Sequence, residues 1–69
     1  MTITEIKAEE VTEGDTFVRD GQPYWTARSD AEIVTNRSKE SLVRVLVQFV
    51  DGGIEDRYWD PETILTVLR

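Results

Sequence analysis

The strongest constraint on the fold is the run Leu42–Val50, in which apolar side chains alternate with others. Positions 43, 45, 47 and 49 are Val, Val, Val and Phe, so they fall on one face of a strand, because successive side chains point to opposite sides. The opposite face mixes Arg44 and Gln48 with three apolar residues. This pattern predicts a central strand with one fully buried face and one half-covered face.

The rest of the chain is also rich in residues that favour strands. Eight Val, five Ile and eight Thr stand against three Ala and four Leu, and β-branched residues favour strands over helices. Turn signals recur at Glu13-Gly14-Asp15, Asp20-Gly21, residues 37–41, Asp51-Gly52-Gly53 and Asp60-Pro61. Short strands separated by such closely spaced turns are typical of a small barrel or sandwich.

These signals together predict the element boundaries and the fold class. We expect strands over Thr2–Lys7, Thr16–Arg19, Tyr24–Arg28, Ala31–Asn36, Leu42–Val50, Ile54–Trp59 and Ile64–Leu68, and a helical turn over Ala8–Thr12. The segment 31–36 is the weakest of these strands. Five to six short antiparallel strands should curl into a small barrel, because closure hides the strand edges. We therefore expect one all-β domain over residues 1–69, an SH3-like antiparallel barrel with one helical turn.

The composition narrows the possible chemistry. The 69 residues include 14 acids against 8 bases, a formal net charge of −6, and neither Cys nor His. Without Cys the chain forms no disulfides or thiolate metal sites, and without His it lacks the commonest general acid and base. We therefore expect no enzyme: no catalytic residues, no cofactor and no metal site.

The sequence also gives expectations about location and partners. No apolar run reaches the roughly 18 residues that a membrane helix needs, and the N-terminus lacks the basic and apolar segments of a signal peptide. Together with the lack of Cys, this predicts a cytoplasmic protein without a membrane partner. Residues 1–20 carry six acids and two bases, and residues 51–69 carry five acids and two bases. Such an acidic chain is repelled by phosphate backbones, which disfavours a nucleic-acid partner.

Four short motifs follow one another between residues 11 and 60: Gly14-Asp15-Thr16-Phe17, Asp20-Gly21-Gln22-Pro23-Tyr24, Val43-Arg44-Val45 and Asp51-Gly52-Gly53. A polar loop at 36–41 carries Lys39 between the second and the third. This order resembles the N-terminal SH3-like, KOW-type domain of elongation factor P and its eukaryotic counterpart. The resemblance implies an SH3-like barrel. In that family the matching loop carries a modified lysine that reaches into the ribosome, although the loop of this chain lacks the family's Pro-Gly-Lys-Gly character.

The segments 14–25 and 58–68 carry a second resemblance. They read GDTF…DGQPYW and YWDPETILTVL, and they are similar to short, acidic, barrel-like proteins encoded by bacteriophages of actinobacteria. This resemblance implies a role inside an infected bacterium, on a host or phage protein.

Two aromatic pairs, Tyr24-Trp25 and Tyr58-Trp59, are the most informative candidate contacts. Neighbouring side chains on a strand point to opposite faces, so we expect one ring of each pair to face away from the core. Such a ring can anchor a partner protein or stack on a base. Trp59 should plug one end of the barrel, which makes Tyr58 the surface residue. The alternative is that both rings pack, one in the barrel and one under a loop or over an Arg stem.

The basic residues of the middle of the chain suggest a second kind of contact. They are Arg28, Arg37, Lys39, Arg44 and Arg57. Arg44 and Arg57 lie on strands joined by the 51–53 turn, and on one face of a hairpin they would resemble a nucleic-acid reader. The alternative is ordinary pairing with neighbouring acids such as Glu40, Glu55 or Asp56.

The leading hypothesis is a non-enzymatic protein-interaction module that docks onto a protein partner or a second copy of itself. It would use an exposed aromatic, a barrel edge or an acidic face, and its candidate surface consists of Tyr24, Trp25, Arg28, Arg44, Leu46, Arg57 and Tyr58. One alternative is a nucleic-acid or ribosome-binding KOW-like module. Another is an inhibitor whose acidic surface mimics DNA.

Overall fold

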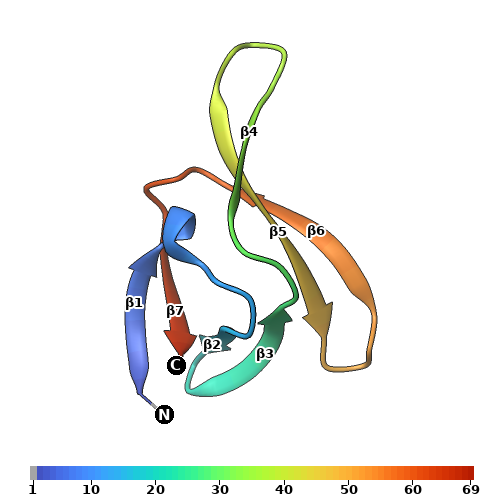
Figure 1. Ribbon diagram of the computed structural model, residues 1–69. Helices are drawn as coiled ribbons and strands as arrows, with labels where there is room; N and C mark the ends of the chain where they lie inside the picture. The colour runs from blue at the N-terminus through green and yellow to red at the C-terminus, as the bar shows by residue number, and fades with distance from the viewer. Residues whose placement is uncertain (1) are drawn as a thin grey trace.

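The computed structural model describes residues 2–69 and consists mainly of antiparallel strands (Figure 1). Its elements are β1 (Ile3–Lys7), the 3-10 turn η1 (Ala8–Glu10), β2 (Thr16–Arg19), β3 (Gln22–Ala27), β4 (Glu32–Thr35), β5 (Ser41–Phe49), β6 (Ile54–Trp59) and β7 (Ile64–Leu68). The predicted all-β fold with one helical turn is confirmed. Seven strands form instead of five or six, because the weak segment does pair and sets Ile33 opposite Val43. Within residues 2–69 no helix is long and apolar enough to cross a membrane.

One curled sheet contains all the strands. Their order is β1-β7-β2-β3-β5-β4, and β6 pairs with the other edge of β5. β3 and β4 share the first edge of β5, one after the other along its length. The predicted barrel-like curl is confirmed (Figure 1), but the sheet remains an open half-barrel, since β1 and β6 each pair with one neighbour within residues 2–69. The inward positions of β6 include Glu55 and Arg57 rather than apolar residues, so this strand has little to gain from closing over the core.

The core lies inside the curl and is centred on β5. Val43, Val45 and Val47 are fully buried, as the alternating pattern predicts, and Phe17 of β2 is buried among them. The remaining core residues come from most of the other elements: Ile6, Ala8, Val11, Ala27 and Val67. The second face of β5 is half-buried, as predicted.

Two glycine turns set the pairing of the strands beside them. Asp20 and Gly21 have positive φ angles of 53° and 76°, as a tight Asp-Gly hairpin turn requires. Between β5 and β6, Phe49 N donates to Gly53 O at 2.7 Å, and Gly52 N donates to Phe49 O at 3.0 Å. Gly52 has φ 96°, so this connection is a three-residue loop ending in a glycine bulge. Phe49 therefore lies opposite Gly53, and that pair fixes the rest of the hairpin.

Asp15 is the one buried charged residue among residues 2–69. Its Oδ2 accepts hydrogen bonds from Thr12 N at 2.9 Å and from Arg69 Nη2 at 3.0 Å, and its Oδ1 accepts one from Arg69 Nε at 3.0 Å. Burial alone raises the pKa of the Asp15 carboxyl, but the hydrogen bonds from Arg69 and Thr12 outweigh it and hold the pKa below its ordinary 3.8. The ion pair therefore links the loop before β2 to the residue after β7.

Asp15→Asn should lower the free energy of unfolding by about 1–3 kcal/mol at neutral pH, because it removes a charged acceptor from a buried ion pair. Since the folded-state pKa lies below 3.8, the carboxylate stabilises the fold above that pH. This contribution is lost as the pH falls through the folded-state pKa. Urea unfolding of the two proteins measures it, and the difference between them should shrink in acid.

The control for this experiment is Asp56→Asn, because Asp56 is exposed. This variant should unfold like the wild type at both neutral and acidic pH. A stability difference for Asp15→Asn that did not change with pH would contradict the role given to its carboxylate.

Candidate interaction surface

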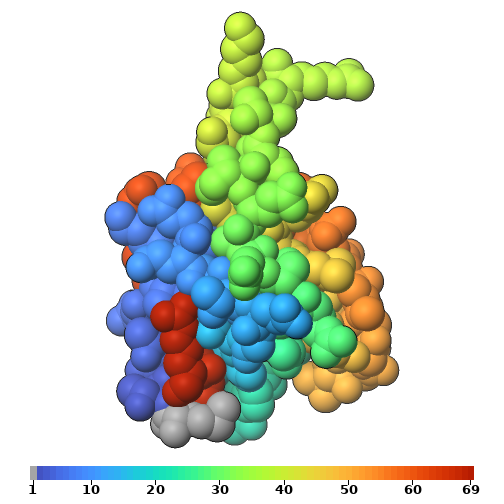
Figure 2. Space-filling view, in the orientation of Figure 1, coloured from blue at the N-terminus to red at the C-terminus, as the bar shows by residue number. Residues whose placement is uncertain are grey.

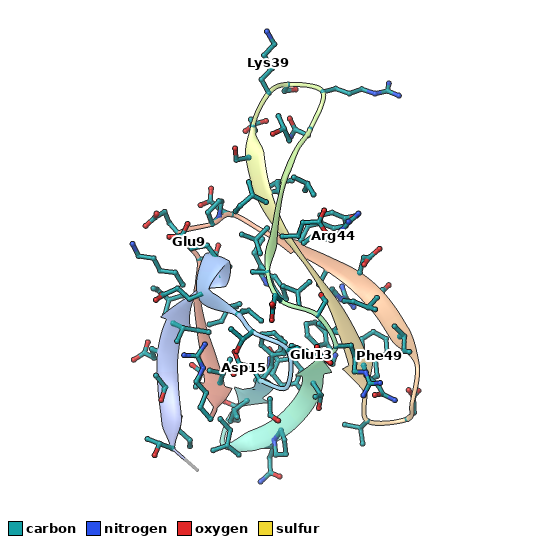
Figure 3. All side chains as sticks on the ribbon, viewed as in Figure 1. Glu9, Glu13, Asp15, Lys39, Arg44 and Phe49 are labelled. Carbon is teal, nitrogen blue, oxygen red and sulfur yellow. The ribbon has the colours of Figure 1, made fainter. Side chains whose placement is uncertain are left out.

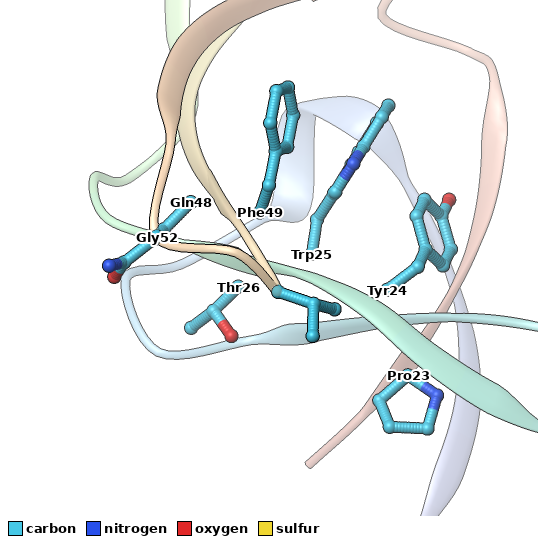
Figure 4. A pocket seen from close by; sticks show the side chains of 8 residues that line it. Pro23, Tyr24, Trp25, Thr26, Gln48, Phe49 and Gly52 are labelled. Carbon is cyan, nitrogen blue, oxygen red and sulfur yellow. The ribbon is translucent and has the colours of Figure 1, made fainter.

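A β-bulge places two neighbouring aromatic rings on the same side of the sheet. Phe17 lies opposite Trp25 and Val18 lies opposite Pro23, so Tyr24 is an extra residue with no partner of its own on β2. A bulge interrupts the alternation of side chains where the extra residue is inserted. Tyr24 and Trp25 therefore both pack against the core and point to one side of β3 (Figure 4). The expectation that one of these two rings faces away from the core is wrong, because it holds only for a regular strand.

The rings of Tyr24, Trp25 and Phe49 stand side by side on one side of the sheet (Figure 4), and these three residues line a groove. The Trp25 ring centroid lies 4.7 Å from that of Tyr24 and 5.7 Å from that of Phe49. The groove has a volume of about 380 Å³, and its remaining lining residues are Pro23, Thr26, Gln48, Val50 and Gly52. We call this site the aromatic groove. Its rings are half-buried and Val50 at its rim is 85% exposed, so apolar surface is available to a ligand.

An arginine of β6 covers part of the aromatic groove. Arg57 Cζ lies 4.6 Å from the ring centroid of Trp25 and 5.7 Å from that of Phe49, within the range of a cation–π attraction. Arg57 Nη2 also pairs with Glu55 Oε2 at 2.7 Å, which holds the guanidinium in place. Arg57 Nε is buried and has no hydrogen-bond partner among the described residues. The inner face of β6 is thus in direct contact with the groove.

The outer face of β5 and β6 carries a second apolar surface. Leu46 lies opposite Asp56 and Arg44 lies opposite Tyr58, so these side chains share the face that points away from the core. Ile54 belongs to the same face and is 57% exposed, and Tyr58 is 52% exposed. The prediction that Tyr58 lies on the surface is confirmed. We call Leu46, Ile54 and Tyr58 the outer patch.

The residues predicted for one interaction surface are divided between the two faces. Arg44, Leu46 and Tyr58 lie on the outer face, Tyr24, Trp25 and Arg57 lie at the aromatic groove, and Arg28 is exposed in the loop after β3. The expectation that Arg44 and Arg57 share a face is wrong, because Val45 is the residue opposite Arg57. Arg44 instead pairs with Glu32 at 2.8 Å, and this hydrogen bond raises the pKa of the Arg44 guanidinium.

The sequence analysis did not assign Val50 and Ile54 to a surface, and it placed Phe49 on the fully buried face of the strand, whereas Phe49 is half-buried and all three belong to these surfaces. Phe49 lines the groove together with Val50, and Ile54 belongs to the outer patch. All three flank the 51–53 turn. A signal was present in the sequence, because apolar residues at the end of a hairpin lie beyond the strands that would cover them.

The β4–β5 hairpin projects from the rest of the molecule (Figures 1 and 2). Asn36 Oδ1 orders its tip by accepting hydrogen bonds from Ser38 N at 2.9 Å and from Glu40 N at 3.0 Å. Lys39 has a positive φ of 64° and lies at the far end of the tip (Figure 3). Arg37 and Lys39 are both exposed, so two cations of this acidic protein lie at the end of the projection.

No protein-family model, no curated protein and no solved structure matches the chain. Functional conclusions therefore rest on the geometry of residues 2–69. The half-barrel fold alone does not determine a function, because one fold can support many different functions.

Arg57→Ala should lower the free energy of unfolding by about 1 kcal/mol, because it removes the cation that covers Trp25 and Phe49. Arg57→Met should cost less, since its apolar stem still covers the rings and it has no buried nitrogen to satisfy. Urea unfolding measures stability, and acrylamide quenching of tryptophan fluorescence reports how far the rings are uncovered. Arg28→Ala is the control, because Arg28 is exposed. Equal results for Arg57→Ala and Arg28→Ala would show that the rings are not shielded by Arg57.

Proposed function

We propose that the protein is a non-enzymatic module that binds another protein through the aromatic groove. The observation that supports this most directly is the exposure of Tyr24, Trp25 and Phe49, which pack against the core on one side and remain half-buried. Aromatic residues carry much of the binding energy at protein interfaces. Rings already fixed by their neighbours lose little conformational entropy when a partner binds, which favours affinity.

A protein partner suits this surface better than a nucleic acid does. The chain has a net charge of −6, and a phosphate backbone is repelled by negative charge. Two of the arginines near the apolar surfaces are paired with acids, Arg44 with Glu32 and Arg57 with Glu55, while a third, Arg19, lies over the Tyr24 ring with its Cζ 4.7 Å from the ring centroid. The unpaired positive charge beside the aromatic groove among residues 2–69 is therefore that of Arg19, which is small against the net charge of −6.

The acidic side chains give less support to the DNA-mimic alternative. Asp15 is buried, and the carboxylates of Asp51 and Asp60 accept hydrogen bonds from the backbone N of Gly53 and Glu62. A mimic presents its carboxylates to a basic partner in place of phosphates. Here several of them stabilise turns and ion pairs within the protein instead.

A second candidate function, nucleic-acid or ribosome binding as a KOW-like module, is favoured by the projecting tip. Arg37 and Lys39 both belong to its loop and are exposed, and Lys39 lies at the far end of the projection (Figure 3). Binding of RNA or DNA that weakens steeply with added salt would support this function, and no binding at low salt would exclude it. The SH3-like relationship to the elongation-factor domain is part of this proposal, and the curled antiparallel sheet is compatible with it.

We also propose a bacteriophage of actinobacteria as the source of the chain, from the resemblance of the segments 14–25 and 58–68. Under this proposal the partner is a host or phage protein in the cytoplasm of an infected bacterium. Expression in an actinobacterial host and cross-linking through the groove would identify that partner.

Peptides selected from a random linear library against the wild-type protein should bind at the aromatic groove. Val50→Asp changes the most exposed apolar side chain of the groove. It should lower the affinity for these peptides by about tenfold or more, which corresponds to the binding free energy of one buried apolar side chain. Isothermal titration calorimetry measures the affinities, and circular dichroism verifies the fold of each variant.

The matched control is Ile3→Asp, because Ile3 is also an exposed β-branched residue, 59% exposed on β1. Its affinity for the peptides should equal that of the wild type. The proposed function would be contradicted if the selection yielded no binding peptide, or if both variants lost affinity for the selected peptides equally.

A further inference from the structure

The pairing of β5 with β6 determines which backbone groups of β6 face outward. Phe49 and Gly53 form a hydrogen-bonded pair at 2.7 Å, and hydrogen-bonded pairs alternate with non-hydrogen-bonded pairs along an antiparallel ladder. Positions 55, 57 and 59 therefore direct their N–H and C=O groups toward β5. The other side of β5 agrees with this assignment, because Leu46 O accepts a hydrogen bond from Arg28 N at 2.7 Å.

The remaining positions of β6, Ile54, Asp56 and Tyr58, direct their backbone groups away from β5. Within residues 2–69, β6 pairs with β5 only, so this edge is free. The same three side chains lie on the outer face and are exposed. The inner face of the strand, through Arg57, contacts the aromatic groove at 4.6 Å. The free edge thus lies between the outer patch and the groove.

We infer that the partner adds to β6 as an extended basic segment, which pairs with the free edge at 54–58. This inference rests on the proposed function and specifies its ligand. A strand that joins a sheet edge gains main-chain hydrogen bonds, and its alternate side chains give specificity. Because those side chains point to opposite faces, one added strand meets the outer patch and the aromatic groove at once.

The charge around β6 specifies a basic partner. Residues 51–62 contain five acids and one base. Four of these acids take part in ion pairs or turn hydrogen bonds, whereas Asp56 is exposed in the middle of the free edge, between Ile54 and Tyr58 on the outer face. A Lys or Arg opposite Asp56 forms a favourable cross-strand pair. Apolar residues two positions to either side of it meet Ile54 and Tyr58. The expected ligand sequence is therefore apolar–x–basic–x–apolar, in an extended conformation.

A second copy of the chain fits this edge poorly. A two-fold axis that pairs β6 with itself must pass through one residue position, since side chains directly opposite each other share a face. An axis at Glu55, Asp56 or Arg57 sets that charge directly opposite its own copy, which is destabilising. An axis near either end of the strand leaves only a short ladder.

The other free edges are less available. On β1, Lys7 N already donates to Glu10 Oε1 at 2.8 Å, and Lys7 Nζ pairs with Glu62 at 3.2 Å. The strand β4 has only four residues, and its edge leads to the charged tip of the hairpin. Among these edges, β6 alone adjoins the aromatic groove.

The test uses the full chain and the peptides selected against the wild type. Asp56→Pro removes one outward N–H but none of the hydrogen bonds to β5, so it should abolish peptide binding. Glu5→Pro is the matched control. Thr2 and Arg69, the residues just before β1 and just after β7, form a hydrogen-bonded pair, so the N–H of Glu5 also faces a free edge. This variant should bind the peptides like the wild type.

Charge and backbone are tested separately. Asp56→Lys leaves the backbone hydrogen-bonding groups of the edge unchanged and should lower the affinity for basic peptides about fivefold or more. Glu5→Lys changes the net charge equally and should lower this affinity less. N-methylation of those peptide N–H groups that face β6 should abolish binding, and N-methylation of the alternate groups should not. This comparison needs no change in the protein, so it decides the question even where Asp56→Pro fails to fold.

Hydrogen exchange gives the direct readout. Support consists of selected peptides with the expected sequence pattern that slow amide exchange at Ile54, Asp56 and Tyr58 and lose binding on N-methylation. Peptides that lose affinity for Val50→Asp but still bind the wild type after N-methylation would overturn strand addition and leave the proposed interaction function intact. Acidic or uncharged selected peptides would overturn the basic ligand. A wild-type dimer in light scattering that Asp56→Pro dissociates would make the occupant a second copy and overturn the inference.

Discussion

The fold depends on β5, which pairs with three other strands along its two edges and fills the core with its inward side chains. Val43, Val45 and Val47 are fully buried because β3, β4 and β6 flank this strand while β2 and β7 lie across the curl. Each buried valine contributes about 1.5–3 kcal/mol relative to an exposed one. The outward side chains of the same strand receive no second layer, so the burial that stabilises the protein also leaves the outer patch uncovered.

The length of the loop after β5 decides which side chains of β6 meet the core. The three-residue loop with Gly52 at φ 96° sets Phe49 opposite Gly53 and turns Arg57 toward Trp25. A two-residue turn at Gly52-Gly53 would shift the pairing by three residues, and a shift by an odd number turns every side chain of the strand to the other face. Tyr58 would then point inward and Arg57 outward. One glycine conformation thus determines the composition of both surfaces.

The sequence predicted the features that follow from regular alternation and failed where alternation breaks. The burial pattern of β5 and the exposure of Tyr58 come directly from a period of two. Tyr24 does not follow this period, because its bulge depends on how β2 and β3 pair, and that pairing is not visible in either strand alone. The division of Arg44 and Arg57 between two faces depends on the loop type. The openness of the half-barrel depends on the charged inner face of β6, which the sequence contains but whose orientation the loop determines.

An open sheet edge beside exposed aromatic rings is a liability, because unpaired strands aggregate. Charge on the edge is the usual protection, and Asp56 stands at the middle of the β6 edge, with Glu55 and Arg57 beside it on the inner face. In a two-fold pairing these charges oppose their own copies, so the edge resists self-association. They do not resist a strand with a complementary charge. The same side chains that would keep such an edge from pairing with itself therefore favour a partner strand of opposite charge. The aromatic groove beside the edge adds affinity for a partner that also supplies apolar contacts.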